Sequence, residues 1–135
     1  SAASDVYKRQ HNIKKEVSGK IGTCMAILTK MQFFWRKAAC PNKFKLMVFD
    51  AVIRSKLVYG LDTVALPQGL ESKLNTFQLK GLRKILNMKT TFINRLNTNK
   101  LVFEQANAFK NPDQKPGKNI IPFSTYVRTR AARFF

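Results

Sequence analysis

Three segments of the chain repeat hydrophobic residues at spacings of three and four, the pattern of an amphipathic helix. The first is expected to run from about Asn12 to Ala39. Its apolar stripe is Ile13, Val17, Ile21, Cys24, Leu28, Met31 and Trp35. Pro41 is expected to end this helix, because proline interrupts helical hydrogen bonding.

The second segment follows Pro41, with Asn42 as the expected N-cap. Gly60 predicts a kink, a helix end or a close helix crossing, since glycine weakens a helix interior. This helix is expected to be the most buried, because Val48, Val52 and Tyr59 widen its apolar surface. Its apolar stripe is Leu46, Phe49, Ile53, Leu57, Gly60/Leu61 and Val64.

The third segment is expected to begin near Leu70, after the Pro67-Gln68-Gly69 punctuation. Its apolar stripe is Leu70, Leu74, Phe77, Gly81/Leu82, Ile85 and Met88. A loop over 90–99 leads to a short fourth helix over 100–109, capped by Asn97 or Thr98. The pattern therefore predicts an all-α fold, a small bundle of about four helices with a C-terminal linker and a truncated fifth helix.

Residues 1–10, SAASDVYKRQ, do not fit this pattern. The stretch from Asp5 to Gln10 looks like a translated sequencing-library adapter, so we expect it to be a non-native scar. A genuine polar tail is the alternative. The expected organisation is then a helical domain over 11–109, a linker over 110–119 with two prolines and a glycine, and a basic helical segment over 120–135 that is cut short.

The net charge is more informative about the binding partner than the rest of the composition. The 135 residues hold 25 Lys/Arg against 7 Asp/Glu, a net charge of +18. A positive field of this size attracts polyanions, and binding to phosphates releases their counterions. Nucleic acid is therefore the leading class of partner, with a merely solvated surface as the alternative. Phe33, Phe34 and Trp35 cannot all face one core, so one of them is a candidate for contact with nucleic acid.

Catalytic and metal-binding patterns are missing from the sequence. The carboxylates stand singly along the chain, whereas a polymerase clusters them around two divalent ions. Cys24 and Cys40 form no metal motif, and we expect two reduced thiols. His11 is the sole histidine. With no signal peptide and no apolar run of about 20 residues, we expect an intracellular protein, nuclear or cytoplasmic, that is not secreted and does not enter a membrane.

Two motifs resemble the reverse transcriptases of non-LTR retrotransposons, in the helical region after the polymerase palm. The first is Lys56-Leu-Val-Tyr-Gly-Leu-Asp62, and the second is Leu74-x-x-Phe-Gln-x-x-x-Leu-Arg-x-Ile-Leu86. The segment from Thr91 to Asn99, TFINRLNTN, resembles the family's capped turn. The resemblance covers roughly residues 13–134. The palm with its carboxylates, any endonuclease domain and the C-terminal zinc knuckle of that family are absent.

The resemblance implies a non-catalytic thumb fragment that grips the backbone of an RNA or RNA/DNA template–primer for an upstream palm. No cofactor is expected in this chain, since the divalent metal would bind the missing palm, and no small-molecule substrate is expected. Lys84 also suits a helix C-terminus, and the arginines of the tail also suit a solvated face. The expected nucleic-acid-binding residues are Lys73, Lys80, Arg83, Lys84, Arg128, Arg130 and Arg133.

Three other interpretations stay open at this point. The chain could be a free-standing basic helical module that binds nucleic acid or protein. A helix bundle that binds an anionic membrane surface is a second alternative, although the apolar faces are needed for one another. The third is a decayed fragment without function.

Overall fold

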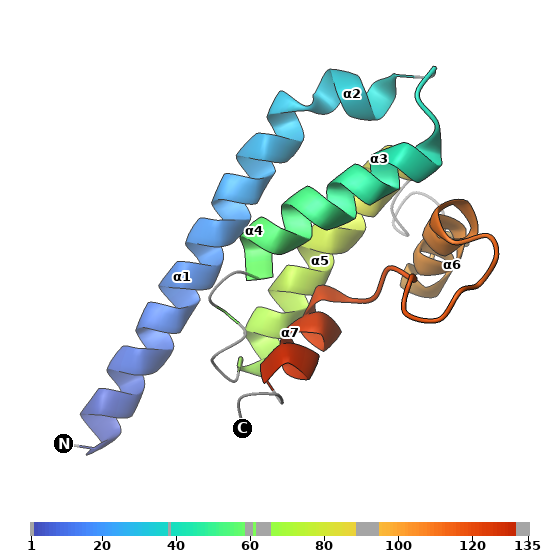
Figure 1. Cartoon of the computed structure of the whole chain (residues 1–135). Helices are drawn as coiled ribbons and strands as arrows, with labels where there is room; N and C mark the ends of the chain where they lie inside the picture. The colour runs from blue at the N-terminus through green and yellow to red at the C-terminus, as the bar shows by residue number, and fades with distance from the viewer. Residues whose placement is uncertain (1, 38, 59–60, 62–65, 89–94, 132–135) are drawn as a thin grey trace.

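The computed structural model describes residues 2–37, 39–58, 61, 66–88 and 95–131, and within these it describes no side chain for Gln10, Arg130 or Ala131. All regular elements in these ranges are helical, which confirms the predicted all-α bundle. Helix α5, Gln68–Leu86, lies at the centre and contacts α1, α3, α6 and α7 (Figure 1). None of the described helices is long and apolar enough to span a membrane.

The first predicted helix is two helices that meet at Met31. Helix α1 is Ala2–Lys30 and α2 is Gln32–Arg36. Trp35 is buried, and its Nε1 donates a hydrogen bond of 3.0 Å to the carbonyl oxygen of Leu28. This bond satisfies a carbonyl near the end of α1, where helical partners run out. The predicted end near Ala39 was wrong by a few residues, because the helix stops at Arg36, before Pro41.

Residues 2–10 belong to α1, and residues 2–9 are exposed. In Figure 1 this end of α1 projects past the other helices. The segment is therefore helical and continuous with the domain, while its adapter origin stays a prediction.

The second predicted helix is a continuous rod of three pieces. These are α3, Asn42–Val48, the π-helical turn η1, Phe49–Ile53, and α4, Arg54–Val58. Pro41 is the N-cap and its carbonyl accepts from the amides of Phe44 and Lys45. The prediction of Asn42 as the cap was wrong: the extended backbone of Pro41 suits the residue before a helix, and Asn42 is the first helical residue. Tyr59, Gly60 and Val64 lie outside the described residues.

Helices α5 and α6 fit their predictions closely. The carbonyl of Pro67 receives the first hydrogen bonds of α5, and Asn87 ends it in the left-handed conformation, with φ 56°. Helix α6 is Asn99–Lys110, and the hydroxyl of Thr98 accepts from the amide of Leu101. Of the two predicted caps, Thr98 is therefore the one observed. The segment over 89–94, including Thr91 to Asn94 of the family-like turn, lies outside the described residues.

The predicted linker is a folded connection in the structure. Lys110 still belongs to α6, and Asn111 after it is buried. The side chain of Asn111 bonds the backbone of Lys115 in both directions and also the side chain of Asn119. Helix α7, Phe123–Ala131, follows and packs on α5 and α4. The predicted helix in the tail is thus present, and the segment before it is held by side chains rather than merely tethered.

One core joins all these elements. Phe49 of η1 is fully buried between Trp35 of α2 and Phe123 of α7, with ring centroids 6.2 and 6.3 Å away. Val58 and Leu79 are buried outside the predicted stripes, but most buried hydrophobic residues from α1 to α5 belong to those stripes. In the described part of the chain they include Val17, Cys24, Leu28, Leu46, Ile53, Leu57, Leu61, Leu70, Leu74, Phe77, Leu82 and Ile85.

Candidate nucleic-acid interface

An open groove of about 490 Å³ runs between α1 and α5. Ile21 and Met25 of α1 and Phe77 of α5 contribute apolar surface, and all three are wholly or partly buried. The other residues that line the groove are polar or basic, namely Ser18, Ser72, Lys73, Thr76 and Lys80. The groove therefore combines an apolar lining with hydroxyl groups and ammonium groups.

Lys73 and Lys80 are both exposed and lie two helical turns apart on α5. Seven residues of α-helix rise about 10 Å, so the two ammonium groups serve separate points along one edge. Their hydroxyl neighbours can donate hydrogen bonds to phosphate oxygens, as can the lysines. Lys84, in the last turn, is half-buried and does not line this groove.

Arg83 connects two helices instead of facing the groove. Its Nη2 donates to the carbonyl of Asn97 and to Oδ1 of Asn99, both at 3.0 Å. The bonds join the end of α5 to the start of α6. Nε of Arg83 is buried and is the one buried side-chain nitrogen or oxygen in the described part without a hydrogen-bond partner. Arg83 therefore has a structural role, whereas its contact with nucleic acid stays a prediction.

Arg128 of α7 is exposed but paired. Its Nε and Nη2 donate to the two carboxylate oxygens of Glu71, at 2.6 and 3.0 Å. The hydrogen bonds and the charge of Glu71 raise the pKa of Arg128 above its ordinary value. The pair ties α7 to the first turn of α5, so a phosphate would have to compete with Glu71. The side chain of Arg130 and all of Arg133 lie outside the described residues.

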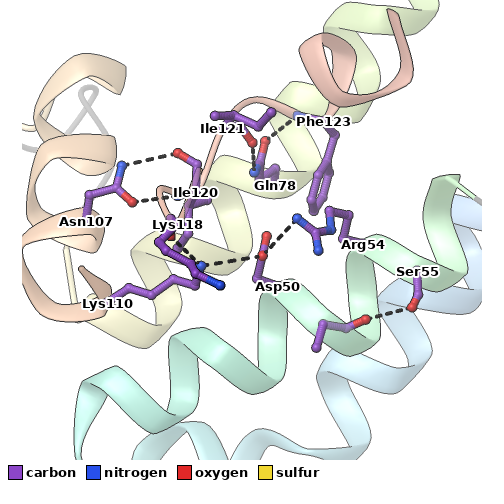
Figure 2. A network of polar contacts seen from close by, with 11 residues as sticks. Asp50, Arg54, Ser55, Gln78, Asn107, Lys110, Lys118, Ile120, Ile121 and Phe123 are labelled. Carbon is purple, nitrogen blue, oxygen red and sulfur yellow. Dashed lines mark hydrogen bonds and ion pairs between the residues drawn. The ribbon is translucent and has the colours of Figure 1, made fainter. Parts of the chain in front are cut away.

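Amide side chains hold the segment before α7, a role the sequence reasoning missed. Asn107 bonds the carbonyl and the amide of Ile120, and Gln78 bonds the carbonyl of Ile121 and the amide of Phe123 (Figure 2). Asn75 holds Ser124 in the same two-sided way. Gln78 lies four residues from both Leu74 and Leu82, so a glutamine on the apolar stripe of α5 was a signal that could have identified it. No pattern in the sequence singles out Asn75 or Asn107.

Asp50 is the second feature that sequence reasoning missed. It is buried in η1, where its carboxylate pairs with Arg54 at 3.1 Å and with Lys110 of α6 at 3.9 Å (Figure 2). Lys110 Nζ also donates to the carbonyl of Lys118 at 2.7 Å. Burial raises the pKa of the Asp50 carboxyl, although Arg54 and Lys110 pull it the other way. This cluster connects the rod, α6 and the loop before α7.

A larger hollow of about 800 Å³ lies between α1 and α4, but its chemistry favours a polyanion less. Lys20 and Lys56 line it together with the carboxylate-bearing Glu16. Cys24 also lines it, yet the thiol is almost fully buried, and burial raises its pKa. A thiol of raised pKa is a poor nucleophile. Among the described residues, no group of three or more His, Cys, Asp and Glu is placed to hold a metal ion.

The chain matches no protein-family model, and comparisons with curated proteins and with solved structures also find no match.

Proposed function

We propose that this chain is the thumb region of a non-LTR retrotransposon reverse transcriptase and that it holds the backbone of an RNA or RNA/DNA template–primer. The observation that supports this most is the α1–α5 groove, in which Lys73 and Lys80 lie beside Ser72 and Thr76. The motifs that resemble that family fall on the same helix, between Leu74 and Leu86. The function proposed for the chain itself is binding, with the chemistry assigned to a palm.

The physical basis is electrostatic. With a net charge of +18, the protein attracts any nucleic acid at long range. The groove adds a defined place where two ammonium groups and three hydroxyl groups meet a backbone. Contacts of this kind fix the position of a duplex and carry little sequence information. Binding that is strong, salt-dependent and independent of sequence is therefore expected.

The test is a double variant, Lys73→Gln with Lys80→Gln, measured for RNA/DNA duplex affinity over a series of salt concentrations. If both lysines contact phosphates, affinity falls, and the slope of log K against log salt becomes shallower by about 1.5, from about 0.7–0.9 per phosphate contact. Both side chains are exposed, so the far-UV circular dichroism spectrum should not change.

The matched control is Lys115→Gln with Lys118→Gln, which removes the same charge from the exposed loop before α7. We expect this control to bind nearly as well as the wild type. An equal loss in both double variants would show that net charge alone attracts the duplex, and it would contradict the proposed interface.

A further inference from the structure

The turn from α2 to α3 carries an aromatic cluster with two exposed rings. Phe33 is 80% exposed and Phe44 is 51% exposed, the highest exposures among phenylalanines in the described part of the chain. Phe34 lies between Phe44 and the buried Trp35, with its ring centroid 5.0 Å from that of Trp35 and 6.0 Å from that of Phe44. Trp35 is in turn fixed by its bond to Leu28. The ring of Phe44 is therefore held on a rigid aromatic support.

The charge around these rings has one sign. Residues 17–49 contain no Asp or Glu, and their basic residues are Lys20, Lys30, Arg36, Lys37, Lys43 and Lys45. Arg36, Lys37 and Lys43 are exposed and flank the two phenylalanines in sequence. No ion pair forms on these three within the described residues. We call Phe33, Arg36, Lys37, Lys43 and Phe44 the aromatic–basic corner.

From these observations we infer that the aromatic–basic corner binds single-stranded nucleic acid, with bases stacked on Phe33 and Phe44 and phosphates on the flanking cations. Flat exposed rings beside cations are the combination that single-strand binding surfaces use, because every base offers a face for stacking. A duplex hides those faces. The corner therefore suits unpaired nucleotides, whereas the α1–α5 groove suits a backbone.

The position of the corner fits this division. It lies at the far end of α1 from the N-terminus, where α2 turns back toward α3 (Figure 1). Met25, in the groove, lies five residues before the end of α1 at Lys30, a rise of about 8 Å, and Phe33 follows in α2. A strand leaving a duplex in the groove has only a few nucleotides to travel to the corner. The inference rests on the proposed function in one respect, namely that the partner of the chain is a nucleic acid.

A membrane surface fits the corner less well. Interfacial helices present a long apolar face, whereas α2 has five residues and α3 turns its apolar side into the core. Phe33, Phe44 and Met47 are the large apolar side chains that α2 and α3 leave exposed, and they give a bilayer little apolar area to cover. Base stacking needs no more than a ring face.

Fluorescence provides the test, because Trp35 is the single tryptophan and is buried. A Phe33→Trp variant places a new indole at the corner, and a 12-nucleotide single strand of mixed sequence should quench it. The wild type reports the background from Trp35. Phe109→Trp is the matched control, since Phe109 is also exposed but lies on α6. No quenching of Phe33→Trp at saturating oligonucleotide would overturn the inference.

Measurement of single-strand affinity provides a test that does not depend on fluorescence. Phe33→Ala should weaken single-strand binding about tenfold, from the stacking energy of one base, and leave duplex affinity and the circular dichroism spectrum unchanged. Equal single-strand affinity in Phe33→Ala and wild type would overturn the inference. A blue shift of Phe33→Trp with phosphatidylserine vesicles and no response to the oligonucleotide would assign the corner to a membrane instead.

These arms separate the two proposals. The Lys73/Lys80 variant tests duplex binding in the groove, and the Phe33 variants test single-strand binding at the corner. Unchanged duplex affinity in the lysine variant, with quenching of Phe33→Trp intact, would contradict the groove proposal and leave the corner proposal standing. Reduced duplex affinity without quenching would contradict the corner proposal alone.

Discussion

Gly81 of α5 lies directly against the Phe49 ring of η1. A Cβ built on Gly81 would lie 2.5 Å from Cζ of Phe49, well inside van der Waals contact. The Phe49 ring cannot move aside easily, because it is fully buried between Trp35 and Phe123. Glycine is therefore used here for a close helix crossing, not for backbone freedom.

We expect Gly81→Ala to destabilise the protein. Overpacking of a rigid core costs about 1–3 kcal/mol, which exceeds the gain of about 1 kcal/mol from replacing a helical glycine. Urea unfolding followed by circular dichroism measures the change. The control is Gly22→Ala in α1, where nothing lies within 4 Å of the new Cβ, and a gain of up to about 1 kcal/mol is expected. Stabilisation by both variants would contradict the close crossing.

Asp50 predicts a pH dependence of stability. Burial raises the pKa of its carboxyl from the ordinary value of 3.8, so the folded protein holds this proton more tightly than the unfolded chain does. The contribution of Asp50 to the free energy of unfolding is then fully present below pH 3.8 and is lost as the pH rises through the folded-state pKa.

The measurement is urea unfolding of wild type and Asp50→Asn at a series of pH values from 3 to 7. The difference in free energy of unfolding, wild type minus variant, should fall as the pH rises above 3.8. A difference that rises over this window would mean that the ion pairs with Arg54 and Lys110 outweigh burial.

At the scale of elements, the π-helical turn explains how the rod keeps one face in the core. Phe49, Ile53 and Leu57 are all fully buried and follow one another at spacings of four residues. An α-helix has 3.6 residues per turn, so this spacing alone would rotate the stripe away from the core. A π-helical turn holds an extra residue and resets the register. The turn also places Asp50 where α6 supplies Lys110.

Amide side chains dock α7 together with the buried side chains of Phe123 and Val127. Asn75 and Gln78 project from α5 and Asn107 from α6, and each bonds the backbone or a side chain in Ile120–Ser124 from two sides. They satisfy backbone groups that a buried loop would otherwise leave unpaired. Docking of α7 thus depends on three polar residues as well as on Phe123.

Gln78→Ala should cost about 1–3 kcal/mol, because it leaves a buried carbonyl and a buried amide without partners. Hydrogen exchange of the Phe123 amide should become faster, together with that of its neighbours in α7. Gln105→Ala provides the control, since Gln105 is an exposed glutamine on α6, and little change is expected. Unaltered exchange at Phe123 in Gln78→Ala would show that apolar packing alone holds α7.

At the scale of the whole molecule, the basic residues divide into structural and free groups. Arg83 and Arg128 use their guanidinium groups to connect helices, which suits a planar fork with several donors. Lys73 and Lys80 remain exposed at the groove. The net charge of +18 therefore overstates what any one surface offers a polyanion. Within the described residues, the lysines of the groove and the cations of the aromatic–basic corner are exposed and form no ion pair, so they are available to phosphate.

The all-α class, the central parts of the helices and most of the buried hydrophobic residues could be predicted from the sequence alone. Helical periodicity is a local property, so Leu74, Phe77 and Leu82 could be assigned to the core without knowing what they would face. Helix capping also depends on local residues, and Thr98 was therefore among the predicted caps. Asn42 was predicted wrongly, because the neighbouring Pro41 is the N-cap.

Which polar residues form ion pairs and hydrogen bonds with one another could be learned from the tertiary structure alone. Asp50 and Lys110, Glu71 and Arg128, and Gln78 and Phe123 are distant in sequence, and their pairing depends on how the helices cross. A periodicity argument treats Lys73, Lys80, Arg83 and Lys84 as one basic face. The fold separates them, because α1 borders one side of α5 and the start of α6 covers the end that carries Arg83. Side-chain type sets what a residue can bind, but three-dimensional neighbours determine whether that capacity is already used.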